Sequence, residues 1–354
     1  MEELHRDWTL SRAYTRYRKS RNAFLFIGLI LLGVLIFVAL ATGSLRIPLS
    51  TVVRVLFTAD RSGQGRVIWD VRMPRVLAAV LVGAGLSLSG TVMQSVLRNP
   101  LASPYTLGLS SAAAFGASVA IVFFGAGTST SSTIIVSNFF SVATSAFFFS
   151  LLSTAAILAL AAATDISAHS MVLAGIAISS IFSAGLTLMQ YLADSVQLSS
   201  IVSWTFGDLG RTSWRALGSI ALVFFPLFFL SLLHRYNFNA MDSGEESARG
   251  LGVRTSALRI GGMLASSLVS ATIVSFFGTI AFIGLLGPHI ARRIFGADHR
   301  YLMLASPLLG AVVLLLADTV ARTVLDPMVL PVGVLTSLLG GPLFISLLLR
   351  GRKR

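Results

Sequence analysis

The sequence contains no cysteine and only two lysines among its 354 residues, and charged residues make up just 12% of it. Without cysteine, the chain has no disulfide framework, no cysteine-ligated zinc and no thiol nucleophile. A phosphate-binding loop needs a lysine directly after a glycine-rich turn, and neither Lys19 nor Lys353 follows one. The chain therefore lacks this route to ATP hydrolysis. Soluble globular domains carry about 25% charged residues, roughly twice the share found here.

Apolar residues and arginine dominate what is present. Hydrophobic residues make up 55% of the chain, the mean hydropathy is +0.84 and the net charge is +13. A basic chain can bind nucleic acid. Here, however, the arginines lie in short stretches between long apolar runs, which is the pattern of loops that flank membrane helices. We predict a protein embedded in the lipid bilayer, with no nucleic-acid partner.

Apolar segments of about spanning length recur along the whole chain. Because lipid offers the backbone no hydrogen-bond partner, each segment is expected to be a helix. The first, 23–41, follows a basic stretch and is longer than the core of a signal peptide, so it is expected to be retained. We predict an all-α polytopic membrane protein with a single transmembrane domain over 1–354. The ten predicted spans are 22–43, 74–96, 106–126, 133–163, 170–192, 216–234, 257–278, 280–295, 303–321 and 333–349.

The two halves of the chain share a faint duplication. Gly90-Thr91 is followed by Pro100, and Gly278-Thr279 is followed by Pro288 at the same ten-residue spacing. With ten spans, these two stretches lie on opposite sides of the membrane. The spacing therefore suggests an inverted internal repeat, an arrangement common in transporters.

The distribution of charge predicts the orientation. If both termini are cytoplasmic, 18 of the 27 lysines and arginines lie inside, in agreement with the positive-inside rule. The segments 1–21 and 235–256 are then cytoplasmic, and 44–73 is an external loop. That loop and its border run against the rule, and an acidic external partner is a natural reason. The arginines concerned are Arg46, Arg54, Arg61, Arg66, Arg72 and Arg75.

The spans contain little that could couple transport to an ion gradient. Proton and sodium coupling usually place acidic residues within spans, and Asp318 is the only carboxylate well inside one. Arg322 follows it by one helical turn, so a structural ion pair is expected. A lone histidine, His289, has no partners with which to bind a metal, and no metal site is predicted. A stand-alone secondary transporter or channel remains the alternative function.

Several stretches resemble the permease subunits of ATP-binding-cassette (ABC) importers for iron–siderophores, haem and vitamin B12, the FecCD-type permeases. The resemblance covers nearly the whole chain. Ser103 and Val329 depart from it, because the family usually has an acidic residue at each place. The stretches are Arg72-Met-Pro-Arg75, Gly90-Thr-Val-Met-Gln94, Arg98-Asn-Pro-Leu-Ala-Ser-Pro104, Leu107-Gly-Leu-Ser-Ser111, Gly278-Thr-Ile-Ala-Phe-Ile-Gly-Leu-Leu-Gly-Pro-His-Ile-Ala-Arg-Arg293, Ala317-Asp-Thr-Val-Ala-Arg322, Leu330-Pro-Val-Gly-Val-Leu-Thr336 and Gly341-Pro342.

The resemblance implies an assembly and a role. The permease would pair with a second permease subunit, either the same chain or a sister. Two cytoplasmic ATPase subunits would hold the ATP and magnesium, so this chain is expected to bind no cofactor and not to be an enzyme. An extracellular or periplasmic binding protein would deliver an iron chelate (siderophore or haem) or a solute such as vitamin B12. The expected location is the cytoplasmic (inner) membrane of a prokaryote, and the expected mechanism is alternating access.

The resemblance also assigns the arginines at the outer ends of two spans. In the family, arginines at the positions of Arg72, Arg75 and Arg322 meet glutamates of the binding protein. The planar guanidinium suits this task because it binds carboxylate through two hydrogen bonds. Interfacial snorkelling is the alternative, and for Arg322 so is the pair with Asp318.

The segment 243–252 reads as a short cytoplasmic helix. Ser243 and Glu246 fit a capping box, and Gly250 or Gly252 fits a left-handed helix end. The resemblance makes this the coupling helix that inserts into an ATPase subunit, and a surface connector is the alternative.

An apolar ridge on this helix is expected to enter the ATPase groove. Ala248 and Leu251 lie three residues apart and so share a helix face. The predicted coupling residues are Ser243, Glu245, Glu246, Ala248, Leu251 and Gly252.

The fifth span carries a stripe of polar residues at helical spacing. Small residues in such a stripe also allow close helix packing, so both a pathway lining and a packing face stay open. The family resemblance favours the pathway. The stripe consists of Ser179, Ser183, Thr187 and Gln190.

A proline-stiffened turn follows the second span. The resemblance places the cytoplasmic gate there, at Asn99 and Leu101, and a plain helix-ending turn is the alternative.

Overall fold

The computed structural model describes residues 2–43, 45–61, 63–125, 127–130, 133–136, 139–164, 167–325 and 328–351. The last three residues, 352–354, which belong to the cytoplasmic charge predicted from the sequence, lie outside the described residues. The helices are α1 Glu2–Ala41, α2 Leu49–Thr58, α3 Gln64–Arg66, α4 Met73–Val96, α5 Leu109–Phe123, α6 Phe139–Thr164, α7 Ala168–Leu192, α8 Ser195–Thr205, α9 Trp214–Leu233, α10 Arg235–Asp242, α11 Glu245–Gly250, α12 Thr255–Phe277, α13 Ile283–Phe295, α14 His299–Ala321 and α15 Val332–Gly351. A π-helical segment, η1 Val67–Arg72, leads into α4, and a 3₁₀ turn, η2 Leu209–Arg211, precedes α9.

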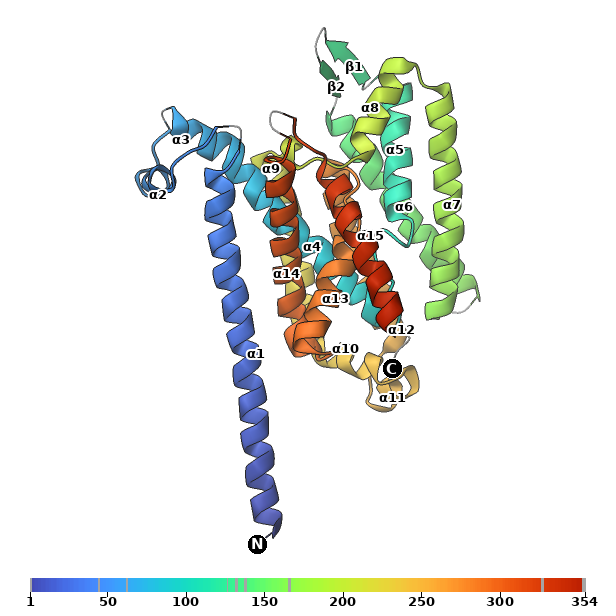
Figure 1. The fold of residues 1–354 in the computed structure, drawn as a ribbon. Coiled ribbons are helices and arrows are strands. Elements are labelled where there is room, and N and C mark those ends of the chain that lie inside the picture. The colour runs from blue at the N-terminus through green and yellow to red at the C-terminus, as the bar shows by residue number, and fades with distance from the viewer. Residues whose placement is uncertain are drawn as a thin grey trace.

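The long helices run side by side and give the molecule two ends (Figure 1). One end carries α2, α3, α8 and a small hairpin, and we call it the α2 end. The opposite end carries α10 and α11, and we call it the α11 end. Helix α1 stands at one edge of the bundle and α7 at the other.

The predicted helical membrane fold is confirmed, although the number of ten spans is not. Each predicted span coincides with a helix, and seven helices in the described part of the chain are long and apolar enough to cross a membrane. Helices α5 and α13 have only 15 and 13 residues. At about 1.5 Å per residue, such helices cover roughly three quarters and two thirds of a 30 Å hydrocarbon layer.

Two segments differ from their predicted form. The span expected at 133–163 begins as a strand, β2 Thr133–Val136, which pairs antiparallel with β1 Gly127–Thr130. Threonine, isoleucine and valine favour strands over helices, and α6 starts only at Phe139. The expected external loop at 44–73 contains α2, α3 and η1. Hydropathy shows which segments are apolar, but it does not predict whether such a segment forms a helix, a strand or a loop.

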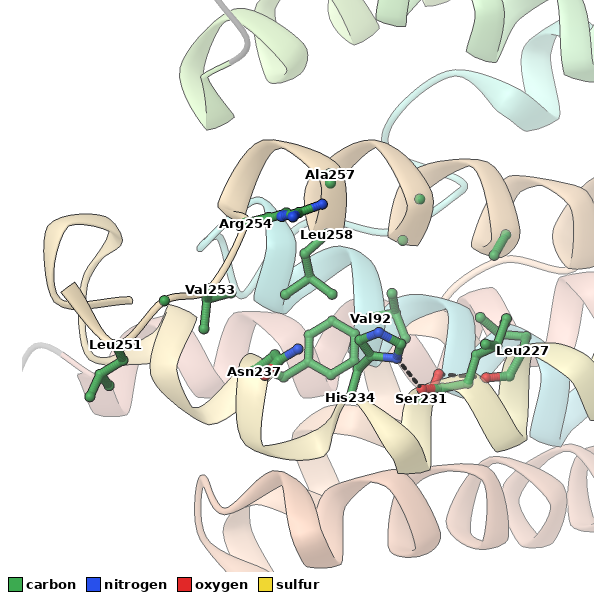
Figure 2. A pocket seen from close by; sticks show the side chains of 16 residues that line it. Val92, Leu227, Ser231, His234, Asn237, Leu251, Val253, Arg254, Ala257 and Leu258 are labelled. Atoms are coloured by element: carbon green, nitrogen blue, oxygen red, sulfur yellow. Dashed lines mark hydrogen bonds between the residues drawn. The ribbon is translucent and has the colours of Figure 1, made fainter. Parts of the chain in front are cut away.

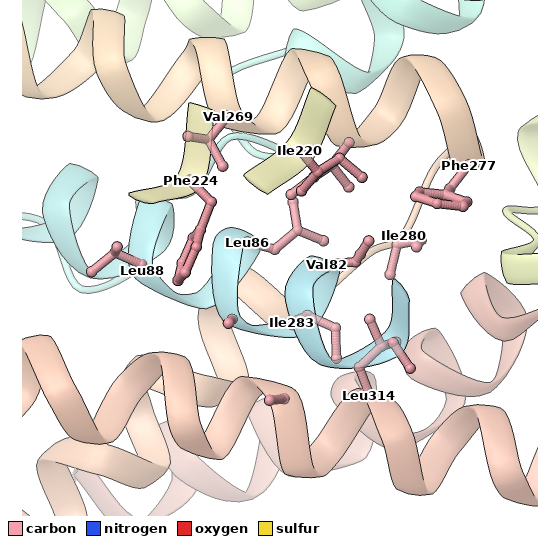
Figure 3. Close-up of a cluster of buried hydrophobic side chains, with 14 of the residues drawn as sticks. Val82, Leu86, Leu88, Ile220, Phe224, Val269, Phe277, Ile280, Ile283 and Leu314 are labelled. Atoms are coloured by element: carbon pink, nitrogen blue, oxygen red, sulfur yellow. The ribbon is translucent and has the colours of Figure 1, made fainter. Parts of the chain in front are cut away.

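Helix α4 forms the centre of the bundle (Figure 3). In the segment 64–96, 83% of the most apolar stretch is buried, against 11% for α7. Val82, Leu86 and Leu88 of α4 are fully or almost fully buried, and Phe224 of α9 and Leu314 of α14 belong to the same core. Helix α4 is therefore the one that the other helices surround.

Helices α4 and α14 approach closely through small residues. A side chain on Gly83 would collide with the backbone of Gly310, and the Ser87 hydroxyl lies 2.7 Å from both the carbonyl oxygen and the hydroxyl of Ser306. In lipid, the hydrophobic effect does not drive helices together. Small residues let their backbones approach closely enough to associate by packing. This seam joins the middle of α4 to α14 along its buried face.

The matched Gly–Pro spacing does not mark equivalent places in the structure. Gly90 lies inside α4 against Gly284, and Pro100 lies in the following turn. Gly278 ends α12 with a φ of +74°, whereas Pro288 lies inside α13. The spacing therefore gives the inverted repeat no support, and the repeat itself stays a prediction.

Candidate functional site

A buried carboxylate joins two helices at the α2 end. Asp318 of α14 is fully buried and accepts hydrogen bonds from Arg75 of α4 at 3.0 Å (Nε to Oδ1) and 2.8 Å (Nη2 to Oδ1). The other oxygen pairs with Arg322, whose Nε lies 3.0 Å away. The predicted pair of Asp318 and Arg322 is confirmed. The second partner, Arg75, could not be found from spacing because 243 residues separate it from Asp318.

Arg72 and Arg322 both bind the end of α1. Arg72 Nη1 donates to the carbonyl oxygen of Leu40 at 2.6 Å, and its Nη2 donates to that of Leu45. Arg322 Nη2 donates to the carbonyl oxygen of Ala39 at 3.3 Å. The last carbonyls of a helix have no partner within it and attract positive charge. These two arginines therefore help to cap the last turn of α1.

The three arginines expected to meet a binding protein are consequently engaged inside the chain. Arg72 and Arg322 are 5% and 8% exposed, so neither projects outward from the chain. Their docking role itself stays a prediction. The arginines exposed at this end include Arg46, Arg54, Arg61 and Arg66.

At the α11 end, the predicted capping box is absent. Ser243 ends α10, and its hydroxyl donates to the carbonyl oxygen of Asn239 at 3.3 Å. Helix α11 begins at Glu245 after Gly244, whose φ of +124° makes the turn between the two helices. Only glycine adopts that conformation freely. The turn takes Ser243 into the end of α10, so Ser243 cannot cap α11.

The end of α11 matches the prediction made for Gly252. Its φ is +82°, its N–H donates to Arg249 O at 2.9 Å, and the N–H of Val253 donates to Ala248 O at 3.0 Å. These two bonds form a Schellman motif. Val253 and Ala248 also belong to one apolar cluster, which is the side-chain contact that usually accompanies the motif.

Ala248 and Leu251 do not form a common ridge. Ala248 is fully buried against Met241 and Leu258, whereas Leu251 is 73% exposed. The helix ends between the two residues, so helical spacing no longer places them on one face. The expectation of an Ala248/Leu251 ridge is wrong, and Leu251 alone projects from the element.

Glu245 anchors α11 to the bundle. Its Oε2 accepts from Nη2 of Arg259 at 2.8 Å, and its Oε1 accepts from Arg249 at 2.8 Å and from Thr255 at 3.3 Å. Arg259 is fully buried, and its Nε donates to the carbonyl oxygen of Val96 at 3.1 Å. The hydrogen bond from Arg259 is the main cause that lowers the pKa of Glu245. Glu246, by contrast, is exposed.

A second set of bonds ties α10 to the bundle. The His299 Nε2 lies 2.9 Å from Asp242 Oδ2 and 2.8 Å from Ser95 Oγ. Asn239 donates to Asp298, the N-cap of α14, at 3.0 Å. Burial opposes ionisation of Asp298, but hydrogen bonds from Arg300 and Asn239 outweigh it and lower its pKa to about 2. No sequence pattern had pointed to any of these contacts.

The predicted gate lies immediately after α4. Asn99 Oδ1 accepts from the N–H of Leu101 at 2.9 Å, and the N–H of Asn99 donates to Gln94 O at 3.1 Å. The preceding Arg98 has a φ of +46° and is the turn's left-handed residue. Leu101 is 44% exposed. This geometry fits both a gate and a helix-ending turn.

The polar stripe on α7 has two environments. Ser179 packs against Gly108, and its hydroxyl lies 3.3 Å from that of Ser111. Ser183 and Thr187 are exposed, and Gln190 is half-buried. Packing therefore describes the Ser179 end of the stripe, while Ser183 and Thr187 face away from the chain.

A cavity of about 500 Å³ opens beside the α11 end (Figure 2). It lies between α9–α10 and the start of α12, with Val92 of α4 in its wall. His234 and Asn237 border it on one side and Arg254 on the other. The Gly261-Gly262 pair is the sequence feature that could have suggested this cavity. A side chain at Gly261 would meet nothing within 4 Å.

A bundle of apolar helices around a buried central helix, with a folded and charge-anchored element at one end, is the architecture of a polytopic membrane protein. The family model of the FecCD transport family matches residues 30–350, and the chain belongs to that family. It is a permease subunit of an ABC importer, and its chemistry is transport.

Relatives and a solved structure agree with this assignment. The chain is 43% identical to a Methanocaldococcus jannaschii protein assigned as an ABC transporter permease, covering 98% of this chain and 99% of that one. It is 38% identical to the hemin transport system permease protein HmuU of Yersinia pestis, covering 90% and 95%. The solved structure of an ABC transporter assigned to the metal-chelate type, in an inward-facing conformation, is 32% identical with a TM-score of 0.80 and covers 93% and 99%.

Proposed function

We propose that this chain carries an iron chelate across the cytoplasmic (inner) membrane of a prokaryote by alternating access. A relative named for hemin and a structural neighbour of metal-chelate type support this cargo class. The observation that carries the proposal is α11, a six-residue helix outside the bundle that ends beside an exposed Leu251. Such a rigid element with one projecting apolar side chain suits docking into the groove of another protein.

The proposed orientation places the α11 end in the cytoplasm. The excess of lysine and arginine on that side supports this through the positive-inside rule, and both termini are then cytoplasmic. Two ATPase subunits dock at α11 and hold the ATP and magnesium. This chain itself binds no cofactor, which fits its lack of a phosphate-binding loop.

A binding protein docks at the α2 end in this arrangement. The exposed Arg46, Arg54, Arg61 and Arg66 give that end a positive surface, which attracts an acidic partner and steers its approach. Arg72, Arg75 and Arg322 contribute by fixing the helices beneath this surface, and they bind the partner directly only if their internal bonds open.

The second permease subunit faces α7, and the solute passes between the two subunits. Helix α7 lies at an edge of the bundle with large apolar residues exposed, among them Ile181 and Leu188 at 64% and 54%. The exposed Ser183 and Thr187 supply polar groups along the same helix. The turn at Asn99 and Leu101 closes the pathway at the cytoplasmic side.

The test is reconstitution of the chain in vesicles with the ATPase and binding protein encoded beside it. We expect ATP hydrolysis and uptake to rise together when ferric hydroxamate, ferric citrate, haem or cobalamin is supplied on its binding protein. The matched control omits the ATPase. Uptake that continues without the ATPase and follows an ion gradient would instead identify a secondary transporter.

A further inference from the structure

We infer that two side-chain relays, Asp242–His299–Ser95 and Glu245–Arg259–Val96, transmit movement of α10 and α11 to the gate turn after α4. This inference rests on the proposed function, because it assumes that α11 receives the movement of an ATPase. It assigns positioning roles to residues that contact neither cargo nor ATP.

The first relay joins α10 to α4 through the buried imidazole of His299. One nitrogen, Nε2, lies 2.9 Å from Asp242 Oδ2 and 2.8 Å from Ser95 Oγ. The other nitrogen, Nδ1, is buried and has no hydrogen-bond partner among the described residues. The proton of a neutral imidazole therefore belongs on Nε2, where the carboxylate accepts it, and this assignment follows from the contacts. A displacement of Asp242 must move His299 or break the contact between the two side chains.

The second relay joins α11 to the backbone of α4. Glu245 accepts from Arg259 at 2.8 Å, and Arg259 donates to the carbonyl oxygen of Val96, the last residue of α4, at 3.1 Å. That carbonyl has no partner within the helix. Because Arg259 is fully buried, losing Glu245 removes a carboxylate that balances its charge, which is costly. The link is therefore stiff.

Both relays end on consecutive residues of the last turn of α4, three and four residues before Asn99. The same turn provides Gln94, whose carbonyl oxygen accepts from the N–H of Asn99 at 3.1 Å. The end of α4 and the gate turn are thus one hydrogen-bonded unit. Two separate outer elements, α10 and α11, hold this unit from different sides.

Anchoring alone explains these contacts less completely than coupling to the gate turn does. Simple anchoring of α10 and α11 would need bonds to any part of the bundle, and the apolar cluster around Ala248 already provides that. Here both relays end on the four-residue stretch that leads to the gate turn. Anchoring alone would not require the two relays to meet there. Energetic coupling needs an element with two arrangements that both sites bias, and here that element is the gate turn.

Ser95→Ala is the sharpest variant, because it removes one hydroxyl and leaves the Asp242–His299 and Glu245–Arg259 contacts in place. Ser89→Ala is the matched control, since Ser89 lies on the same helix, is fully buried and has a hydroxyl without a partner among the described residues. In the reconstituted complex we expect Ser95→Ala to lower uptake per ATP hydrolysed by about fivefold, the lower end of typical coupling between sites. The ATPase rate and the thermal midpoint should stay near those of the control.

A second readout uses the isolated permease chain in detergent and needs no transport. Asp242→Asn should speed hydrogen exchange of the amides of Asn99, Leu101 and Ala102 by about fivefold relative to Ser89→Ala, because the first relay restrains that turn. Combining Asp242→Asn with Ser95→Ala should add little, since both break one relay. Combining Asp242→Asn with Glu245→Gln should multiply the effects, since the relays run in parallel.

The two readouts separate the possible failures. A wild-type complex that neither hydrolyses ATP nor moves cargo would remove the proposed function, while the exchange experiment would still judge the relays. Exchange in the gate turn that is equal in Asp242→Asn and Ser89→Ala would overturn the inference. So would equal uptake per ATP in Ser95→Ala and Ser89→Ala.

Discussion

The two ends of the molecule use the same chemistry for different purposes. At the α2 end, arginines cap α1 and share the buried carboxylate of Asp318, and every bond closes within the bundle. At the α11 end, Arg259 likewise caps a helix, but its carboxylate partner belongs to an element that projects outside the bundle. A closed cluster fixes helices relative to one another. A cluster that leads outward can also transmit a displacement.

The largest effect is expected from Asp318→Asn, which removes the carboxylate that two largely buried arginines share at the α2 end. Breaking a buried ion pair by removing one partner costs about 3–5 kcal/mol. We expect a sharp loss of folded protein in detergent, measured by thermal unfolding. Asp208→Asn is the control, because Asp208 lies 3.9 Å from Arg75 with 40% of its side chain exposed. Equal stability of the two variants would mean that the closed cluster does not hold the α2 end.

Leu251→Arg is expected to act only on assembly at the α11 end. The side chain is 73% exposed, so folding should be unchanged, while loss of an interface anchor costs about 2 kcal/mol or more of binding free energy. Co-purification of the ATPase should therefore fall about thirtyfold. Leu325→Arg, at the α2 end and 50% exposed, is the control. Ala248→Arg should instead disrupt α11 itself, since Ala248 is fully buried.

Helix α4 holds the centre of the bundle, and Gly83→Ala tests its seam with α14. The new methyl group would collide with the backbone of Gly310, and overpacking costs about 1–3 kcal/mol. Gly261→Ala is the matched control, because nothing lies within 4 Å of the added atom. It should be neutral or slightly stabilising. Thermal unfolding of both variants would show whether the seam is as tight as its geometry indicates.

Helix α7 belongs to neither end, and cysteine labelling can establish what it faces. The chain has no native cysteine, so Ser179→Cys, Ser183→Cys and Thr187→Cys can be labelled singly. We expect a membrane-impermeant thiol reagent to modify positions 183 and 187 in at least one transport state and to spare position 179, which packs against Gly108. Equal protection of all three would favour a packing face.

The smallest effect concerns acid sensitivity at the α11 end. The folded-state pKa of Glu245 is lowered, so its contribution to stability is present above the unfolded pKa and is lost as the pH falls through the folded one. The contribution of Asp298 to stability changes with pH in the same direction, because its pKa is also lowered, to about 2. Protection of α10 and α11 from hydrogen exchange should therefore decline as the pH falls below about 4.5. Glu245→Gln should flatten that dependence, and an unchanged slope would contradict it.

Hydropathy alone predicted the positions of the spans, because a membrane helix must be apolar over most of its length. The pair of Asp318 and Arg322 was also predictable, since four residues make one helical turn. The bonds of Arg75 and Arg259 to distant residues were not, because spacing carries no information on which helices become neighbours. The capping box at Ser243 failed for a local reason: Gly244 turns the chain before the serine can cap.

The caps on α1 have a consequence for how the chain is made. Arg72 follows α1 by about thirty residues, but Arg322 is synthesised only when most of the chain has been inserted. During synthesis, α1 thus stands in lipid with its terminal carbonyls only partly satisfied, and its most apolar stretch is only 11% buried even in the finished fold. The first helix to enter the membrane is therefore among the last to be secured. A nascent chain that stops before residue 322 leaves it loosely held and open to membrane quality control.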